Sequence, residues 1–504
     1  ETRWKLGQGY VISTSQDTQT LFAAQILCDV LCGSNHAPLC RAVLETGLAE
    51  DVTLSCDDEC LQPMLLLQVQ NFRRDDLPAI EQTIRRTLTD LCEQGLDREQ
   101  IEASLASFEF RLRERDYGTM PRGLVFSLEI LSSWLYGGDP AARLGFGPVF
   151  EQLRQAIGTG YYEALLRRLL LSCDHTASIL MQPSATCGEA RQAREKEALA
   201  AVLQTLSAQQ QDEIRARQTR LAALQQEPDI PHVCLSDLPR DPAPVPTELR
   251  EDGSVIIHDL QTDGIVYTTA YFAADDLTPE ELPYLTLLRS VLSQLPAGEM
   301  DAQELQKQLR LRLGSFSVGV SPITQLRDPQ AYQLYATASC SALGSKLPEA
   351  LSLAAAILTK TDFTNRGKLL EILRQLRDGL QQQIVSSGSS FAMLRASAAL
   401  NAAGACTERS GGVDFYRWLC ALEREFDARA DACIAALQRL SEKLFVTARL
   451  RLSVTGGTED ERQTVLRVLR EALPAGQAPG PAYPAPLLPI RREGIVIPSE
   501  VSFA

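Results

Sequence analysis

The sequence predicts an α+β protein that consists of two tandem units joined by a long helical hairpin. The predicted elements of the first half recur in the same order in the second half, which indicates a duplicated unit. Between the halves, residues 187–226 are almost entirely Ala, Leu, Gln, Glu and Arg, which are strong helix formers. With 504 residues, of which 45% are hydrophobic and 22% charged, the chain can form more than one core.

The first unit is predicted to cover residues 1–186. Apolar runs predict strands at 9–13, 52–55, 64–69 and 176–181, and helical spacing of apolar residues predicts helices over 18–31 and 75–92. Gly95 is placed to end the second helix. Asp97 then begins another helix, with Gln100 in the capping-box position.

The connection between the units is predicted to span residues 187–250. Ser207 and Gln210 form a capping box that divides 187–226 into the two helices of the hairpin. Prolines recur over 228–246, where they remove backbone donors and favour extended chain. We therefore expect a linker after the hairpin.

The second unit is predicted to cover residues 251–473. Its expected strands are 255–258, 265–272, 315–320, 333–341 and 449–454, and its expected helices are 347–358 and 365–385. Thr278 and Glu281 predict a further helix start. Corresponding strands of the two units are about 270 residues apart, which supports a duplication. Residues 474–504 are predicted to be a second Pro-rich linker, followed at 494–498 by the first strand of a truncated further domain.

The composition excludes several classes of function. Lys and Arg number 49 against 64 Asp and Glu, a formal net charge of −15, whereas nucleic-acid binders carry a basic surface. No apolar stretch is long enough to span a bilayer. The 13 cysteines are spread along the chain, unlike those of a small disulfide scaffold. We expect no nucleic-acid or membrane partner, and a cytoplasmic or other reducing compartment.

One group of residues suggests metal binding. Cys28, Cys32, His36 and Cys40 recur every four residues, and Cys56 and Cys60 follow. Thiolates and imidazoles are good zinc ligands, but structural zinc sites usually have two residues between paired cysteines, and here there are three. The alternative is that these thiols are buried as small apolar groups.

The motifs of the common hydrolases are absent from the sequence. With only four histidines, the chain has neither His-Glu-x-x-His nor His-x-x-Glu-His, and it has no Gly-x-Ser-x-Gly. It also has no Gly-Lys-Ser/Thr phosphate loop. We therefore expect no catalytic residue and no metal ligand in this chain.

Two segments carry a resemblance to a known family. Residues 109–124, Glu-Phe-Arg-Leu-Arg-Glu through Gly-Thr-Met-Pro-Arg-Gly-Leu, resemble a signature of the presequence-protease branch of the pitrilysin (inverzincin) metallopeptidases. Residues 387–396 resemble that family's Ser-Gly-His-x-Tyr-Ala-x-x-Arg-Ala run, with Ser389 in place of the His. By charge pattern alone, 109–124 is an exposed charged helix followed by a Gly-Pro break.

The resemblance implies two tandem pitrilysin-like α/β sandwich domains, the non-catalytic second and third domains of the family, joined by the family's helical linker. It implies a parent zinc metalloendopeptidase that degrades unfolded peptides in a closed chamber, with the zinc in a missing N-terminal domain. This chain would be inactive alone, and its partners would be unfolded peptides and the missing catalytic and C-terminal domains. Arg113, Glu114 and Arg122 are the candidates for residues facing the chamber. The alternative is a non-catalytic scaffold or partner-binding subunit.

Overall fold

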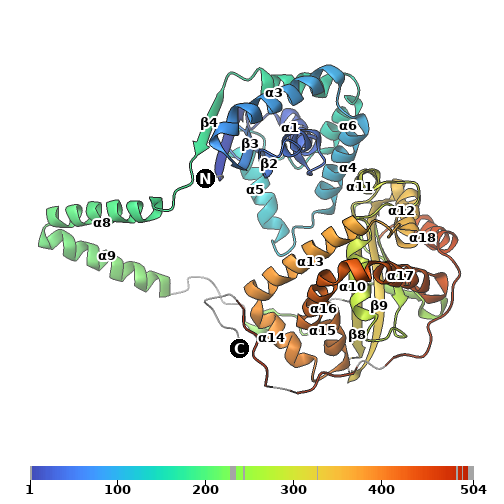
Figure 1. Ribbon diagram of the computed structural model, residues 1–504. Helices are drawn as coiled ribbons and strands as arrows, with labels where there is room; N and C mark the ends of the chain where they lie inside the picture. Colours follow the sequence, from blue (N-terminus) through green and yellow to red (C-terminus); the bar gives the residue numbers. More distant parts are fainter. Residues whose placement is uncertain are drawn as a thin grey trace.

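The computed structural model describes residues 3–226, 234–241, 244–325, 327–483, 486–490 and 492–497. Two units, each with its own sheet and hydrophobic core, are connected on one side by an extended helical hairpin (Figure 1). This arrangement agrees with the predicted α+β fold.

The first unit contains an antiparallel sheet with the strand order β2-β3-β1-β4. Its strands are β1 (Trp4–Val11), β2 (Asp51–Asp57), β3 (Met64–Phe72) and β4 (Thr176–Met181). Its helices are α1 (Thr18–Cys32), α2 (Pro38–Leu44), α3 (Leu77–Gln94), α4 (Arg98–Glu114), α5 (Arg122–Trp134), α6 (Gly147–Gln155) and α7 (Tyr161–Leu166), followed by a π-helical turn at Arg167–Leu171. Side chains alternate along β3, so that Leu65, Leu67 and Val69 enter the core.

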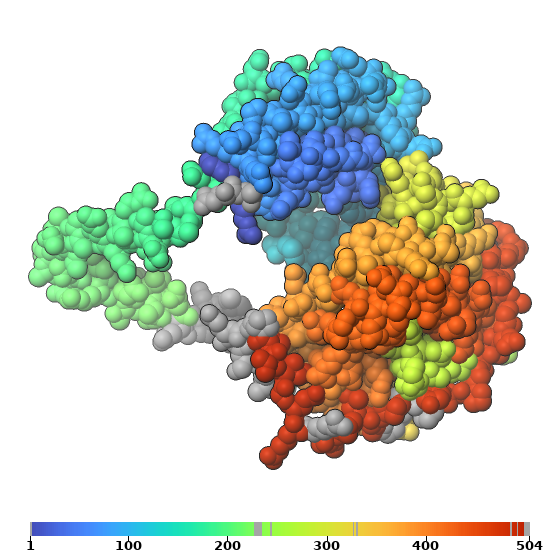
Figure 2. All heavy atoms as spheres, in the orientation of Figure 1, coloured from blue at the N-terminus to red at the C-terminus, as the bar shows by residue number. Residues whose placement is uncertain are grey.

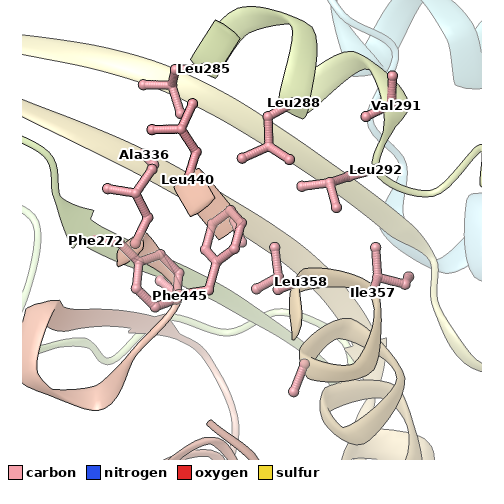
Figure 3. Packing of buried hydrophobic residues seen from close by; sticks show 14 of the residues in the cluster. Phe272, Leu285, Leu288, Val291, Leu292, Ala336, Ile357, Leu358, Leu440 and Phe445 are labelled. Carbon is pink, nitrogen blue, oxygen red and sulfur yellow. The ribbon is translucent and has the colours of Figure 1, made fainter. Parts of the chain in front are cut away.

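The second unit contains a six-stranded sheet with the order β5-β6-β10-β7-β9-β8. Its strands are β5 (Thr247–Arg250), β6 (Val255–His258), β7 (Ile265–Ala273), β8 (Ser315–Gln325), β9 (Asp328–Leu343) and β10 (Leu450–Thr455). Its helices are α10 (Leu282–Val291), α11 (Ala302–Arg312), α12 (Leu347–Lys360), α13 (Arg366–Ser386), α14 (Gly388–Ser397), α15 (Ala402–Gly411), α16 (Val413–Arg424), α17 (Phe426–Leu444) and α18 (Glu459–Ala472). Phe272 on β7 packs edge-to-face against Phe445 at the end of α17, with ring centroids 5.2 Å apart (Figure 3).

The two sheets share a four-strand arrangement. The order β2-β3-β1-β4 of the first unit corresponds to β8-β9-β7-β10 of the second, and all three neighbouring pairs are antiparallel in both. The second sheet continues beyond β10 with β6, which is parallel to β10, and then β5. The repeated element order in the sequence therefore corresponds to a repeated topology. β5 lies within the stretch that the sequence predicts to be a linker, yet it joins this sheet.

The hairpin consists of α8 (Cys187–Thr205) and α9 (Ala208–Gln226), as predicted. Its capping box is present, because the Ser207 amide donates to Gln210 Oε1 at 2.9 Å and the Gln210 amide donates to Ser207 Oγ at 3.2 Å. α8 has no buried residue. The hairpin is thus a projection from the two units and is exposed to solvent.

Three local predictions are wrong in detail. Asp97 caps α4, but Gln100 reaches away from it and donates to the Val30 carbonyl at 3.3 Å, so the second half of that capping box is absent. The helix expected from Thr278 begins only at Leu282, where Pro283 fits the first turn; the Thr278 amide still donates to Glu281 at 2.9 Å. Residues 494–497 are not in a strand, and residue 498 lies outside the described part.

Candidate functional site: the junction between the two units

The units meet where α4 of the first packs against α11 of the second (Figure 1). Lys307 on α11 forms an ion pair with Glu99 on α4. Arg310 on α11 forms a second ion pair with Asp29 at the end of α1. These contacts are polar and partly exposed, which is typical of interfaces that can open.

At the centre of the junction, an aromatic ring rests on a glycine. Phe110 on α4 is 4% exposed although it lies outside both core clusters. A Cβ atom on Gly314, between α11 and β8, would lie 1.9 Å from Cζ of Phe110. Only a residue without a side chain allows this approach.

Arg113 belongs to an ion-pair cluster on the first-unit side. Its guanidinium donates to Glu109 Oε1 at 2.7 Å, and Arg154 on α6 donates to Glu109 Oε2 at 2.6 Å. Burial opposes ionisation of Glu109, but the hydrogen bonds from Arg113 and Arg154 outweigh it and hold the Glu109 pKa below its ordinary value. Both carboxylate oxygens are therefore occupied by arginines.

Glu114 and Arg122 lie near a tyrosine of the second unit. Burial raises the pKa of Glu114, and a hydrogen bond to Tyr267 on β7 partly offsets this effect. Burial and the negative charge of Glu114 raise the pKa of Tyr267 to about 12, while Arg122 lowers it. The structure thus places all three predicted site residues at the junction, although Arg113 is in a different cluster from Glu114 and Arg122.

An open space separates the units on the side of the hairpin. Figure 2 shows this space between the first unit above, the second unit below and the hairpin at the left, with the position of α5 at its back. α5 carries several exposed apolar side chains, namely Leu124, Leu128 and Trp134. Exposed apolar groups in a recess between two units are suited to contact another chain.

The second resemblance segment lines a large groove elsewhere in the second unit. The groove has a volume of about 1070 Å³ and lies between α14, α16 and residues 488–497. Arg395 at its centre pairs with Glu408, Asp414 and Glu493 at 2.7–2.9 Å. Glu408 is fully buried. Ser389, the residue at the family's His position, is exposed. No local pattern indicated this network, because its members are not close in the chain.

The cysteine-rich segment does not form a metal site. In the described part of the chain, no group of three or more His, Cys, Asp or Glu side chains could hold a metal ion. Cys28 and Cys40 are buried, and Cys40 Sγ contacts the Val52 carbonyl at 3.1 Å, whereas His36 is exposed. The zinc interpretation of Cys28–Cys60 is therefore wrong, because the helices bury the thiols against separate neighbours. Likewise, no described helix has the length and apolarity needed to cross a membrane.

The fold and the junction define a class of non-catalytic peptidase-like α+β units. Residues 4–108 match the family model described as Peptidase M16 inactive domain, and residues 181–422 match the model of the region associated with subfamily C of the M16 peptidases. The chain belongs to the presequence-protease branch of the pitrilysin (M16) metallopeptidase family and corresponds to a non-catalytic part of it.

Two curated relatives agree with this assignment. Protein HypA of Clostridium perfringens is 28% identical over 460 residues, covering 90% of this chain and 47% of that protein. Presequence protease 1, chloroplastic/mitochondrial, of Arabidopsis thaliana is 27% identical over 507 residues, covering 97% and 46%. A crystal structure of pitrilysin aligns with 96% of this chain and 48% of its own at 12% identity, with a TM-score of 0.46. The chain spans about half the length of the curated relatives it matches.

Proposed function

We propose that this chain is the chamber-forming, non-catalytic portion of a zinc oligopeptidase that degrades unfolded peptides. The observation that carries the proposal is the open space between two units of a peptidase family, backed by the exposed apolar residues of α5 (Figure 2). A chamber of this kind selects by size, because an extended peptide enters it and a folded protein does not. In this proposal Arg113, Glu114 and Arg122 belong to the chamber wall.

The residues of this chain do not fit a catalytic zinc ion, since no ligand set is present in its described part. The zinc, the water that it activates and the residues that hold it would therefore belong to another portion of the protein or to a partner chain. This chain would contribute walls and a hinge. We place it in a reducing compartment, in keeping with buried thiols such as Cys340 and Cys406 and with relatives named mitochondrial or chloroplastic.

Exposed apolar side chains also support a missing partner. The hairpin exposes six large ones, Leu199, Val202, Leu203, Ile214, Leu221 and Leu224. Helices of 19 residues gain most of their stability from packing, yet none of the described side chains of α8 and α9 is buried. The same observation favours a second candidate function, a non-catalytic scaffold or partner-binding subunit whose hairpin holds a separate protein.

The two candidates differ in what the open space binds. We would titrate the chain into a fluorescein-labelled, unstructured basic peptide and follow the anisotropy, with a folded basic protein of similar charge as competitor. The chamber proposal predicts saturable peptide binding that the folded protein does not displace.

A matched pair of variants locates the binding site. Leu128 on α5 and Ile323 on β8 are similarly exposed, at 49% and 46%. Leu128→Gln should weaken peptide binding about fivefold, the loss expected for about 1 kcal/mol of apolar burial. Ile323→Gln should have no effect. Equal effects of the two variants, or displacement by the folded protein, would count against the chamber and in favour of the scaffold.

A further inference from the structure

A smaller cavity lies inside the junction itself. It has a volume of about 470 Å³ and is lined from the first unit by Glu102, Glu109 and Arg154 and from the second by Arg312, Lys346 and Glu461. This volume is within the range of sites that bind small molecules. Any molecule bound here would contact both units at once.

Two cations in this cavity have no carboxylate partner. Within the described ranges, no acidic side chain is at ion-pair distance from Lys346 or Arg312. Lys346 is partly buried, and its Nζ donates to a neutral acceptor, the Leu311 carbonyl, at 2.7 Å. Burial lowers the pKa of Lys346, and the nearby charges of Arg154 and Arg312 lower it further, while Glu102 and Glu109 act in the opposite direction. Positive charge is thus concentrated here at a cost in desolvation and repulsion.

The acidic residues of the cavity are mostly engaged elsewhere. Glu109 uses both oxygens for arginines. Glu461 accepts from the Thr458 amide at 2.7 Å and from the Thr458 hydroxyl at 3.1 Å through one oxygen of its capping box. Glu102 alone remains to balance Lys346 and Arg312, so the centre of the cavity favours an anion.

The beginning of α12 adds a second favourable feature. This 14-residue helix has Lys346 at its N-cap, and no side chain caps its free amides. Gly344, Ser345 and Lys346, which precede the helix, all line the cavity. The positive end of the helix dipole and the two unpaired cations therefore face the same space, the combination with which proteins bind phosphate groups.

We propose that this cavity binds a small phosphate-bearing anion, contacted by Lys346, Arg312 and Arg154, and that the bound anion holds the two units together. The inference goes beyond the chamber function, since it assigns a ligand to the junction. A ligand that binds only the closed junction stabilises it in proportion to the logarithm of the ligand concentration. Such an anion would therefore regulate access to the space between the units.

The test is a calorimetric titration of the full chain with inorganic pyrophosphate at constant ionic strength, together with the variants Lys346→Gln and Arg312→Gln. Arg312 is exposed, so its variant keeps the fold even if Lys346→Gln does not. Arg424→Gln is the matched control, because Arg424 is an exposed arginine of the second unit outside the cavity. A nucleoside diphosphate is titrated in parallel to distinguish a nucleotide from free polyphosphate.

We expect one saturable site per chain, weakened at least about tenfold by each cavity variant, as for the loss of a charge-assisted hydrogen bond, and unchanged in the control. Pyrophosphate should also slow amide exchange in α4 and α11 of the wild type but not of Arg312→Gln. Absence of a saturable site, or equal affinity in all variants, would overturn the inference. Because the readout needs no peptide, such a failure leaves the chamber proposal standing.

Discussion

Replacing Gly314 with alanine tests whether the two units meet as described. The added Cβ would lie 1.9 Å from Cζ and 2.1 Å from Cε1 of Phe110, far inside van der Waals contact. Phe110 is buried and lies on a packed helix, so the ring cannot move away without cost. Overpacking of this kind costs about 1–3 kcal/mol. Because alanine also restricts the unfolded chain, which stabilises by about 0.4–1 kcal/mol, we expect a net loss of about 1–2 kcal/mol.

A double-mutant cycle isolates the contact. Phe110→Ala alone should cost about 3 kcal/mol or more, since it removes a buried aromatic ring. In that background the clash is gone, so Gly314→Ala should be neutral or slightly stabilising. Urea unfolding of the four chains should therefore give a coupling free energy of at least about 1 kcal/mol.

The control is Gly379→Ala in α13, where no heavy atom lies within 4 Å of the added Cβ. This substitution should stabilise the chain by about 0.5–1 kcal/mol through helix propensity. If the effects of Phe110→Ala and Gly314→Ala were instead additive within about 0.5 kcal/mol, the two residues would not be in contact and the described junction would be wrong.

Three further predictions concern electrostatics and capping. Asp276→Asn should cost about 3–5 kcal/mol at pH 7, because Arg449, whose side chain is 3% exposed, loses its partner at 2.7 Å. Hydrogen bonding to Arg449 lowers the pKa of Asp276, so the stabilisation is complete above the unfolded value of about 3.9 and lost below it; the deficit should shrink in thermal unfolding at pH 3, and a larger deficit there would contradict this. Lys307→Glu should cost at most about 1 kcal/mol, and Glu99→Lys in the same chain should restore the loss; no rescue in urea unfolding would exclude the ion pair. Ser207→Ala should weaken the start of α9 by about 1 kcal/mol and reduce helical circular dichroism, and an unchanged spectrum would show that the cap does not matter.

The local patterns of the sequence predicted the regular elements well. Strand β4 and both hairpin helices have the expected bounds, because period-two and period-3.6 apolar patterns and capping residues act over a few neighbours. The duplication was also readable, since repeated element order leads to the same strand order β2-β3-β1-β4 and β8-β9-β7-β10. The helices α14 to α16 had no sufficiently clear pattern and were not predicted.

The contacts that define the candidate site were not predictable from local patterns. Glu114 and Tyr267 meet across the junction although more than 150 residues separate them in the chain. The acidic partners of Arg395 come from two helices and the C-terminal segment. Such groupings depend on how the two sheets and their helices pack, which a single sequence does not state. Conversely, the regular cysteine spacing at 28–40 suggested a grouping that packing does not produce.

The most direct test of the central claim, that this chain is non-catalytic, is cleavage of a quenched fluorescent, unstructured basic peptide by the purified chain. The assay is run with added zinc, with and without a chelator, and with zinc content measured across the purification. We predict no chelator-sensitive cleavage and no stoichiometric zinc. Chelator-sensitive cleavage that elutes together with the chain, accompanied by one zinc ion per chain, would contradict the claim.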